Sequence, residues 1–166
     1  MRIIIAKELH PDEPRVPLIP DHVARLIKKG ATLVAEACLG ERCGWSDSDY
    51  QAAGATVSSD RRQILSSAEL VLRLRKPPIE EIAWLKTGCI HVSFLDPFNE
   101  KDLVQCLAQR GISAISLEMI PRITRAQKMD VLSSQANLAG YVAVVLAANH
   151  SRKIFPMMMT AAGTLT

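Results

Sequence analysis

The sequence predicts an α/β fold, in which helices cover both faces of a mostly parallel β-sheet to give three layers. Short apolar segments alternate with segments of helical spacing along residues 1–117, as crossover units of a parallel sheet require. The composition, with 48% hydrophobic and 22% charged residues, is that of a folded protein. The length of 166 residues leaves room for one such domain. These values exclude a disordered chain, a collagen-like repeat and a disulfide-stapled miniprotein.

The first elements follow from apolar runs and helix boundary signals. Residues 2–6 form an apolar run that predicts the first strand. Pro20 suits the first turn of a helix that continues to residue 29, and Gly30 suits the position just after its end. Residues 32–37 predict the second strand.

Residues 40–45 form a turn-rich loop. Ser46 and Asp49 then provide a capping signal for a short helix that ends at Gly54. The remaining elements of this half are a short strand over residues 55–58 and a short helix over residues 61–67.

The second half continues the alternation of strands and helices. Pro77 and Pro78 interrupt the chain, and Gly111 ends a helix. The elements expected here are strands over 69–74, 89–95 and 112–117 and helices over 79–86 and 99–110. Right-handed crossovers would place helices on both faces, so the pattern resembles the flavodoxin-like or Rossmann-like class. An antiparallel edge strand is compatible with it.

Residues 127–149 contain no helix breaker except Gly140 and predict one long helix. At about 100° per residue, five polar side chains fall within roughly 80° of one another: Gln127, Asp130, Ser134, Asn137 and Tyr141. Such a stripe lines a cleft or is simply the solvated face, and the spacing leaves both interpretations open. After Tyr141 the helix is apolar all round, which predicts burial between layers or domains. Tyr141 is interpreted first as a packing residue, with a site role as the alternative.

Several functional classes are excluded by composition. The net charge of +3 and the 4% aromatic content do not provide a nucleic-acid-binding face. The longest apolar stretch, 141–148, is shorter than the roughly 20 residues of a membrane span, so none is expected. The N-terminal apolar run is too short for a signal peptide. The four cysteines lack zinc-site spacing and predict reduced, mostly buried thiols in a cytosolic protein, with no metal.

No motif in the chain cradles a phosphate by itself. The eight glycines include no pair two residues apart, so the G-x-G-x-x-G fingerprint is absent, and no P-loop, G-x-S-x-G or H-E-x-x-H motif occurs. Residues 160–166 are small and predict a linker toward another domain. The three methionines at 157–159 and the apolar helix predict a surface that another domain covers.

Two stretches carry a specific resemblance. The first is the N-terminal MRIIIAKE followed by EPRVPLIP at 13–20, and the second is PRITRAQKMDVLSSQANLAGY at 121–141, followed by TAAG at 160–163. Together they resemble the N-terminal region shared by alanine dehydrogenase and the alpha subunit of proton-translocating NAD(P) transhydrogenase. The resemblance covers essentially the whole chain.

The alanine dehydrogenase branch implies an arginine, a lysine and a histidine that bind pyruvate. The matching positions here are Arg15, Arg75 and Asp96. A guanidinium does not readily exchange protons, and Asp96 removes a group that titrates near neutrality. Alanine dehydrogenase activity is therefore disfavoured. Arg15 has a second interpretation, as a salt-bridging residue of the loop before the first helix.

The transhydrogenase branch implies an Arg, Gln and Asp set beside the nicotinamide of NAD(H), with catalytic roles for Arg122, Gln127 and Asp130. Arg122 would donate to the carboxamide oxygen or stabilise its loop, and Gln127 would reach the ribose hydroxyls. Asp130 and Ser133 would hold the carboxamide NH₂, so all four residues bind cofactor. Hydride transfer needs two nicotinamide rings in contact and no acid or base on the carbon itself.

The resemblance also implies an organisation. Residues 1–126 would be the N-terminal α/β domain, and 127–166 a long interdomain helix and linker toward a missing NAD-binding Rossmann domain. Helices that return after that domain in the family are also missing, so one sheet face would be incompletely covered. The implied function is the nicotinamide-side wall of the NAD(H) cleft, for hydride transfer from NADH to NADP⁺ coupled to proton translocation.

NAD(H) would bind the complete subunit, whereas this chain alone would bind none and be inactive. The implied partners are the Rossmann domain and the NADP(H)-binding and membrane subunits, in a homo-oligomer that binds no nucleic acid. The implied location is the cytoplasmic side of the inner membrane, as a peripheral domain. Two alternatives stay open: an alanine dehydrogenase-type domain, or a non-catalytic α/β association module.

Overall fold

A computed structural model describes residues 1–153, 155 and 158–165. The chain divides into two compact units, Met1–Ile120 and Pro121–Thr166, which are described separately. The organisation expected from the sequence, with a boundary at 126/127, stays a prediction. Met157, part of the predicted methionine surface, lies outside the described residues. Thr166, the last residue of the predicted linker, also lies outside them.

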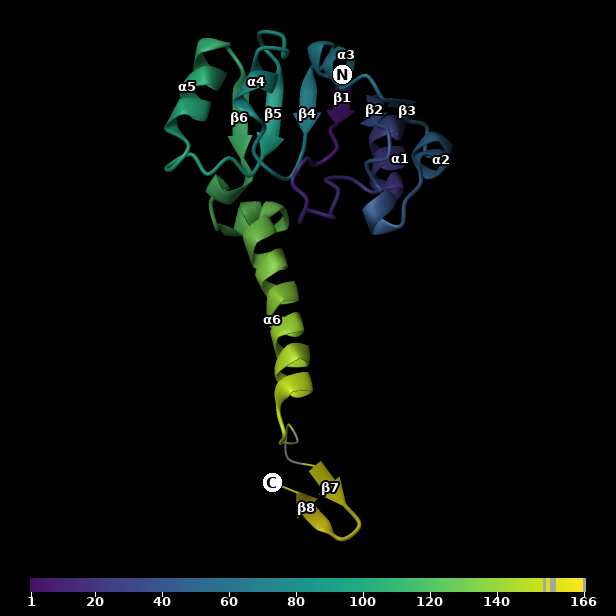
Figure 1. The fold of residues 1–166 in the computed structure, drawn as a ribbon, viewed down its shortest axis with the longest axis vertical. Helices are drawn as coiled ribbons and strands as arrows, with labels where there is room; N and C mark the ends of the chain where they lie inside the picture. The colour runs from purple at the N-terminus through teal and green to yellow at the C-terminus, as the bar shows by residue number, and fades with distance from the viewer. Residues whose placement is uncertain (154, 156–157, 166) are drawn as a thin grey trace. The chain divides into compact units, whose positions relative to one another are not determined.

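The first unit is built on one six-stranded sheet, in the order β3-β2-β1-β4-β5-β6 (Figure 1). Every neighbouring pair of strands is parallel, so the sheet has no antiparallel edge strand. The strands are β1 (Arg2–Ile5), β2 (Thr32–Glu36), β3 (Thr56–Ser58), β4 (Leu70–Leu72), β5 (Ile90–Ser93) and β6 (Ser113–Ser116). The chain order reverses between β1 and β4, which makes the carboxyl ends of these strands the expected binding edge.

Helices lie on both faces of the sheet, which confirms the predicted three-layer α/β class. The helices are α1 (Pro20–Lys28), α2 (Asp47–Ala52), α3 (Arg61–Ser66), α4 (Ile79–Ile82) and α5 (Lys101–Gln109), with the 3₁₀ segments η1 (Glu41–Cys43) and η2 (Leu117–Met119). One apolar cluster joins α1 and α2 to Ile3, Ile5 and Leu33 of the sheet. A second cluster joins α3, α4 and α5 to the opposite face, at Ile4 and Val71.

Local signals set most of these boundaries as predicted. Pro20 occupies the start of α1, and Gly30 adopts φ +88° after its end. Ser46 and Asp49 form a reciprocal capping box at α2. The helix expected over 79–86 is only one turn of α-helix.

The face that carries α1 and α2 is only partly covered by the first unit. By register, Leu72 of β4 lies beside Val92 of β5, which lies beside Ile115 of β6. Leu72 and Val92 are half-buried, and Ile115 is exposed. Leu72 packs against the apolar cluster that contains α1 and α2, whereas Val92 and Ile115, on the same face, belong to neither apolar cluster of the described residues.

The prediction that the cysteines are mostly buried was wrong. All four are free thiols, but only Cys89 is buried, and Cys43 is exposed. Cys43 is the last residue of η1, where its thiol donates a hydrogen bond to the Pro14 carbonyl at 2.8 Å.

The second unit contains η3 (Thr124–Met129), the helix α6 (Val131–His150) and the antiparallel hairpin of β7 (Met158–Thr160) and β8 (Gly163–Leu165) (Figure 1). The long helix therefore begins four residues later than the predicted start at 127. The residues interpreted as a linker form part of the hairpin, with Ala161 and Ala162 in its turn.

Every residue of the long helix from Ser133 to His150 is exposed, so its predicted burial does not occur between layers of the described residues, and burial against another domain stays a prediction. An apolar helix is buried only when another element packs on it. By length and composition α6 is apolar enough to cross a membrane, although no span was expected from the sequence. The helix contains no Asp, Glu, Lys or Arg, and its many Ala, Val and Leu residues keep its mean hydropathy high. Core helices of soluble proteins have the same properties, so no span is assigned.

Candidate functional site

The segment before α6 places four sequence-predicted residues around one cavity. The cavity has a volume of about 320 Å³ and lies within the second unit. It is lined by Arg122, Ile123, Thr124, Gln127, Asp130 and Ser133. The predicted set of Arg122, Gln127, Asp130 and Ser133 is therefore brought together.

The reason they meet differs from the predicted one. Gln127 lies in η3 and Asp130 is the N-cap of α6, so neither belongs to the helix that was expected to align them. A 3₁₀ helix has three residues per turn, so Thr124 and Gln127 lie above one another on one edge. Residues three apart are also neighbours on an α-helix. A 3₁₀ helix and an α-helix therefore bring together residues with the same sequence spacing.

Two hydrogen bonds join Ser133 to Asp130. The Ser133 amide donates to Oδ1 of Asp130 at 2.9 Å, and the Ser133 hydroxyl donates to Oδ2 at 2.6 Å. The hydrogen bond from this hydroxyl is the main reason why the pKa of Asp130 is lowered. The carboxylate stays ionised at neutral pH, and each of its oxygens keeps a lone pair for a further donor.

Arg122 and Gln127 provide the complementary groups. Arg122 also lowers the pKa of Asp130 through its charge, so cation and carboxylate act on the same small volume. Neither Arg122 nor Gln127 has a hydrogen bond from its side chain to another described residue, so both can bind a ligand. A guanidinium, an amide, a carboxylate and a hydroxyl match the donors and acceptors of a carboxamide and ribose hydroxyls.

The remaining residues of the predicted stripe do not join this cavity. Ser134, Asn137 and Tyr141 lie on exposed parts of α6, and none of them lines it. Tyr141 is 72% exposed among the described residues, so its interpretation as a packing residue stays a prediction about another domain.

Arg15 and Arg75 meet at a buried carboxylate in the first unit. Arg15 binds Glu13 through two nitrogens, both at 2.7 Å, and Nε of Arg75 lies 3.0 Å from Oε2 of the same residue. Glu13 is 4% exposed, and the hydrogen bonds from Arg15 lower its pKa to about 2. Both arginines are therefore neutralised internally, in line with the salt-bridge interpretation of Arg15. Sequence reasoning missed Glu13, although it lies in the EPRV motif.

Asp96 shapes a turn at the carboxyl end of β5. Its backbone adopts φ +53°, a left-handed conformation that Asp tolerates better than most residues. Its Oδ1 accepts a hydrogen bond from Nδ2 of Asn99 at 2.8 Å, and its amide donates to Glu118. This carboxylate is thus engaged in local structure, at the position where the resemblance to alanine dehydrogenase implies a histidine.

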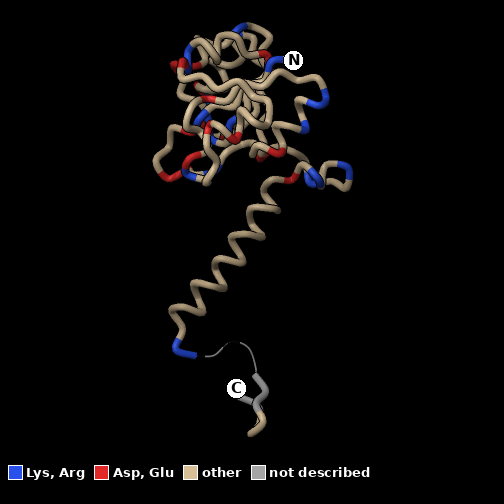
Figure 2. The backbone as a smooth tube through the Cα atoms, turned by 90° about the vertical axis from the view of Figure 1, so that its right-hand side faces the viewer, with Lys and Arg blue, Asp and Glu red and all other residues tan. Residues whose placement is uncertain are grey.

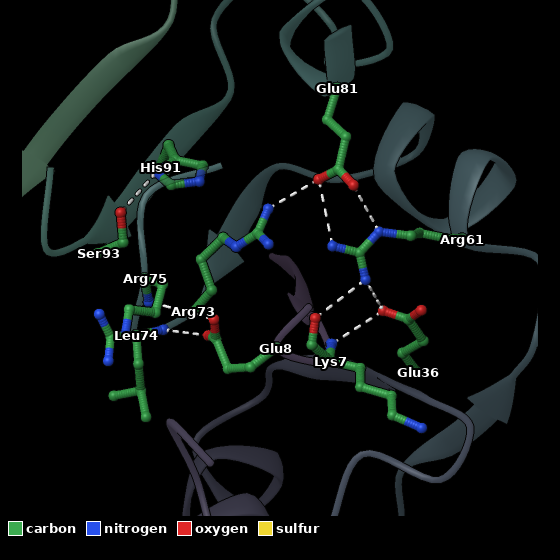
Figure 3. A network of polar contacts seen from close by, with 10 residues as sticks. All are labelled: Lys7, Glu8, Glu36, Arg61, Arg73, Leu74, Arg75, Glu81, His91 and Ser93. Atoms are coloured by element: carbon green, nitrogen blue, oxygen red, sulfur yellow. Dashed lines mark hydrogen bonds and ion pairs between the residues drawn. The ribbon is translucent and has the colours of Figure 1, made fainter. Parts of the chain in front are cut away.

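A buried ionic network lies at the carboxyl ends of β1, β2 and β4 (Figure 3). Glu81 of α4 accepts from Nε of Arg61 at 2.7 Å and from Arg73 at 2.7 Å. Arg61 also pairs with Glu36 and donates to the Lys7 carbonyl at 3.0 Å, so the network fixes the start of the loop after β1. Nothing in the sequence indicated this network beyond the presence of Arg73 at the end of an apolar strand.

His91 lies next to this network without joining it. Burial, and secondarily the positive charge of Arg73, lower its pKa to about 3, so the imidazole is neutral. Its Nε2 has no hydrogen-bond partner among the described residues. Those residues also contain no group of three or more His, Cys, Asp or Glu side chains that could hold a metal ion.

A larger cavity of about 550 Å³ lies at the edge where β1 and β4 end. Arg73, Arg75 and Glu8 are among its lining residues. Glu8 accepts hydrogen bonds there from the amides of Leu74 and Arg75 (Figure 3). Its size alone does not make it the nucleotide site, because none of the four residues implied for nicotinamide lines it.

Comparisons with known proteins agree with the fold and with the motifs. The family model described as alanine dehydrogenase/PNT, N-terminal domain, matches residues 4–139. In Rhodospirillum rubrum the NAD(P) transhydrogenase alpha subunit has separately named parts, and the first of them is 41% identical to this chain over 170 residues. The matched region covers 99% of this chain and 44% of that relative. The solved structure of transhydrogenase from Sinorhizobium meliloti superposes with a TM-score of 0.88 at 40% identity, covering 99% of this chain and 49% of that chain.

An L-alanine dehydrogenase structure superposes with a TM-score of 0.82 at 28% identity, covering 90% of this chain and 40% of that chain. The chain thus spans less than half the length of these relatives. The match to the family model covers most of the chain, including both units at least in part. The chain therefore belongs to the alanine dehydrogenase/PNT N-terminal domain family.

Proposed function

We propose that the chain is the N-terminal part of a transhydrogenase alpha subunit and provides the nicotinamide-side wall of its NAD(H) cleft. The parent enzyme would transfer hydride from NADH to NADP⁺, coupled to proton translocation by other subunits. The observation that carries this proposal is the convergence of Arg122, Gln127, Asp130 and Ser133 on one cavity. Similarity to transhydrogenase alpha subunits supports it.

The residues of the cavity fit a nicotinamide carboxamide and its ribose. Asp130 and Ser133 would accept from the carboxamide NH₂, since both oxygens of Asp130 and the Ser133 hydroxyl keep free lone pairs. Arg122 would donate to the carboxamide oxygen, and Gln127 would bind the ribose hydroxyls. NAD(H) supplies the hydride chemistry when it is bound. The protein residues hold the ring in place, and the lining includes no histidine or cysteine that would act as an acid or base.

Alanine dehydrogenase activity is the rival within the family. Arg75 replaces the lysine and is paired with Glu13, and Asp96 replaces the histidine and forms a turn. These contacts leave no group in either position that exchanges a proton near neutral pH.

Substrate choice tests the proposal in the complete enzyme. We expect hydride transfer from NADH to NADP⁺, and no oxidation of NADH by pyruvate and ammonia. Both reactions are measured by absorbance with the same preparation, using an NADP⁺ analogue whose reduced form absorbs at a separate wavelength. Steady turnover with pyruvate and ammonia that Arg15→Ala abolishes would assign the chain to the other branch.

The isolated chain is expected to fold but to bind NADH with a dissociation constant above roughly 1 mM. It has no glycine-rich turn for the pyrophosphate, and contacts at the nicotinamide end alone must offset the lost freedom of the ligand. Calorimetric titration of residues 1–166 with NADH checks this expectation. Micromolar binding would mean that the nucleotide site is wrongly placed.

The same chain is expected to self-associate, because residues 142–148 of α6 are apolar and exposed. Light scattering over a range of protein concentrations measures this. A strictly monomeric chain would contradict the expectation. In the complete enzyme we propose that the Rossmann domain covers this helix, and that the subunit forms a homo-oligomer on the cytoplasmic side of the membrane.

A further inference from the structure

One purely hydrocarbon side chain lies in the cavity before α6. Five of the six lining residues are polar or charged, and the sixth is Ile123. In Figure 2 blue and red residues lie just before α6, which is tan along its length. A nicotinamide carries its carboxamide and its ribose at the edge of the ring, and its two faces are apolar. The polar lining residues suit the groups at the edge, which leaves Ile123 as the lining residue that suits a ring face.

The backbone holds Ile123 in place at the start of η3. Its amide donates to the Pro121 carbonyl at 3.0 Å, and its carbonyl accepts from the Ala126 amide at 2.9 Å. Ala126 is the buried residue of η3, so this second hydrogen bond ties Ile123 to a packed position. The side chain is branched at Cβ, which restricts its χ1 angle. Ile123 is 54% exposed, so a stiff apolar surface in the cavity is open to a ligand.

Hydride transfer makes different demands on the two faces of the ring. One face must contact the second nicotinamide, which receives the hydrogen of C4 together with both electrons of its bond. The opposite face needs a support from the protein, because hydrogen bonds at the carboxamide and ribose lie near the ring plane and resist movement along the ring normal only weakly. Displacement of a reacting atom by about 1 Å has effects on the order of 10²-fold in rate. A side chain behind the ring therefore controls the distance between the two rings.

We propose that Ile123 is a positioning residue that packs against the face of the nicotinamide opposite to the face from which hydride leaves. This inference rests on the proposed function, because it takes the ring from the transhydrogenase reaction. The four polar residues assigned to the nicotinamide would fix the ring within its plane, and Ile123 would fix its position along the ring normal. The hydrogen that stays on C4 then points toward Ile123, and the transferred hydrogen points away from it.

The first test places Ile123 against the bound ring without any reaction. It uses the complete polypeptide that contains this chain, with isotope-labelled isoleucine methyl groups, and NADH deuterated at one or the other position of C4. The methyl signal that disappears in Ile123→Val is assigned to Ile123. We expect a nuclear Overhauser effect from this methyl group to one C4 hydrogen of bound NADH. That hydrogen should be the one that is retained when the complete enzyme reduces NADP⁺ with the same deuterated samples.

The second test measures the rate in the complete enzyme. Ile123→Ala shortens the side chain and should slow single-turnover hydride transfer roughly 10-fold or more at saturating nucleotide. The dissociation constant for NADH should rise by about 4-fold or less, which corresponds to roughly one methylene of lost apolar contact. Ile123→Val keeps the branch at Cβ and should recover most of the rate. The matched control is Ile79→Ala, the same change at an exposed position of α4, which should transfer hydride at the parent rate.

Parent-like transfer in Ile123→Ala, or a methyl contact with the transferred hydrogen, would overturn the inference. The proposed function fails in a different way. If NADH shifts neither the Ile123 methyl signal nor the side-chain amide signal of Gln127, the cavity does not bind nicotinamide. If NADH shifts the Gln127 amide while the Ile123 methyl contacts neither C4 hydrogen, the role of Ile123 is rejected and the proposed function stands.

Discussion

In the complete enzyme, Gln127→Leu is expected to slow hydride transfer by about 10²-fold, because displacement of a reacting group by roughly 1 Å has effects of this size. The affinity for NADH should change far less, since most of the binding energy comes from the pyrophosphate and adenosine ends of the molecule. Leucine keeps a similar volume and removes both hydrogen-bonding groups of the amide. Single-turnover rates at saturating nucleotide, together with the dissociation constant of NADH, separate the two effects.

The matched control is Gln51→Leu, which makes the same chemical change on an exposed position of α2. It should transfer hydride at the parent rate. A parent-like rate in Gln127→Leu at saturating nucleotide would make the cavity an ordinary solvated surface. It would also restore the interpretation of the polar residues as a solvent-exposed face.

Asp130 needs a different pair of variants, because it also caps α6. Asp130→Ala removes the carboxylate and the N-cap together, and loss of such a cap destabilises the start of α6. Asp130→Asn keeps a good cap and removes only the charge. We expect both variants to slow hydride transfer more than they weaken NADH binding. Slow transfer only in the alanine variant would show that Asp130 acts through the helix start and not on the ring.

Glu81→Gln is expected to lower the free energy of unfolding of the first unit by about 3–5 kcal/mol, the cost of leaving a buried charge uncompensated. Arg61 would keep Glu36 as a partner, but Arg73 has no other ion pair among the described residues and is 2% exposed. Urea unfolding followed by tryptophan fluorescence measures the effect. Both tryptophans, Trp45 and Trp84, lie in the first unit, so the signal reports on that unit.

Glu80→Gln is the control, since Glu80 is the exposed neighbour of Glu81 on α4 and should change stability by less than about 0.5 kcal/mol. The double variant Arg73→Met/Glu81→Leu should recover part of the loss, because it removes both members of a buried pair. A loss below about 1 kcal/mol in Glu81→Gln would mean that Arg73 is compensated by solvent after all.

The same network makes the free energy of unfolding of the first unit depend on pH. Burial by itself raises the pKa of Glu81, but the hydrogen bonds and charges of Arg61 and Arg73 outweigh it, so the pKa is lowered. A lowered carboxylate pKa contributes stability above its unfolded value of 4.5, and this contribution is lost as the pH falls through the folded value. Unfolding curves between about pH 7 and 3 should therefore show a smaller acid loss in Glu81→Gln than in the parent. Glu13, whose pKa is lowered to about 2, also contributes stability that is lost at low pH. This loss is the same in the parent and in Glu81→Gln.

The sequence predicted the fold where local chemistry decides the structure. Pro20, Gly30 and the Ser46–Asp49 box each act within one turn, so their positions mark helix ends without tertiary contacts. Apolar runs separated by helical spacing likewise indicate a parallel sheet. Strand order and the pairing of Glu81 with Arg61 and Arg73 were not predictable, because contacts 20 and 8 residues apart depend on the crossovers.

The sequence by itself also determined which residues form the candidate site, because the motif at 121–141 resembles a known family. Only the three-dimensional structure showed how they meet. Residue spacing of three is common to α and 3₁₀ helices, so the sequence placed Gln127 and Asp130 on a helix that in fact begins at Val131. The start is fixed by the carboxylate of Asp130, which accepts the amide of Ser133 and so ends the 3₁₀ segment where α6 begins.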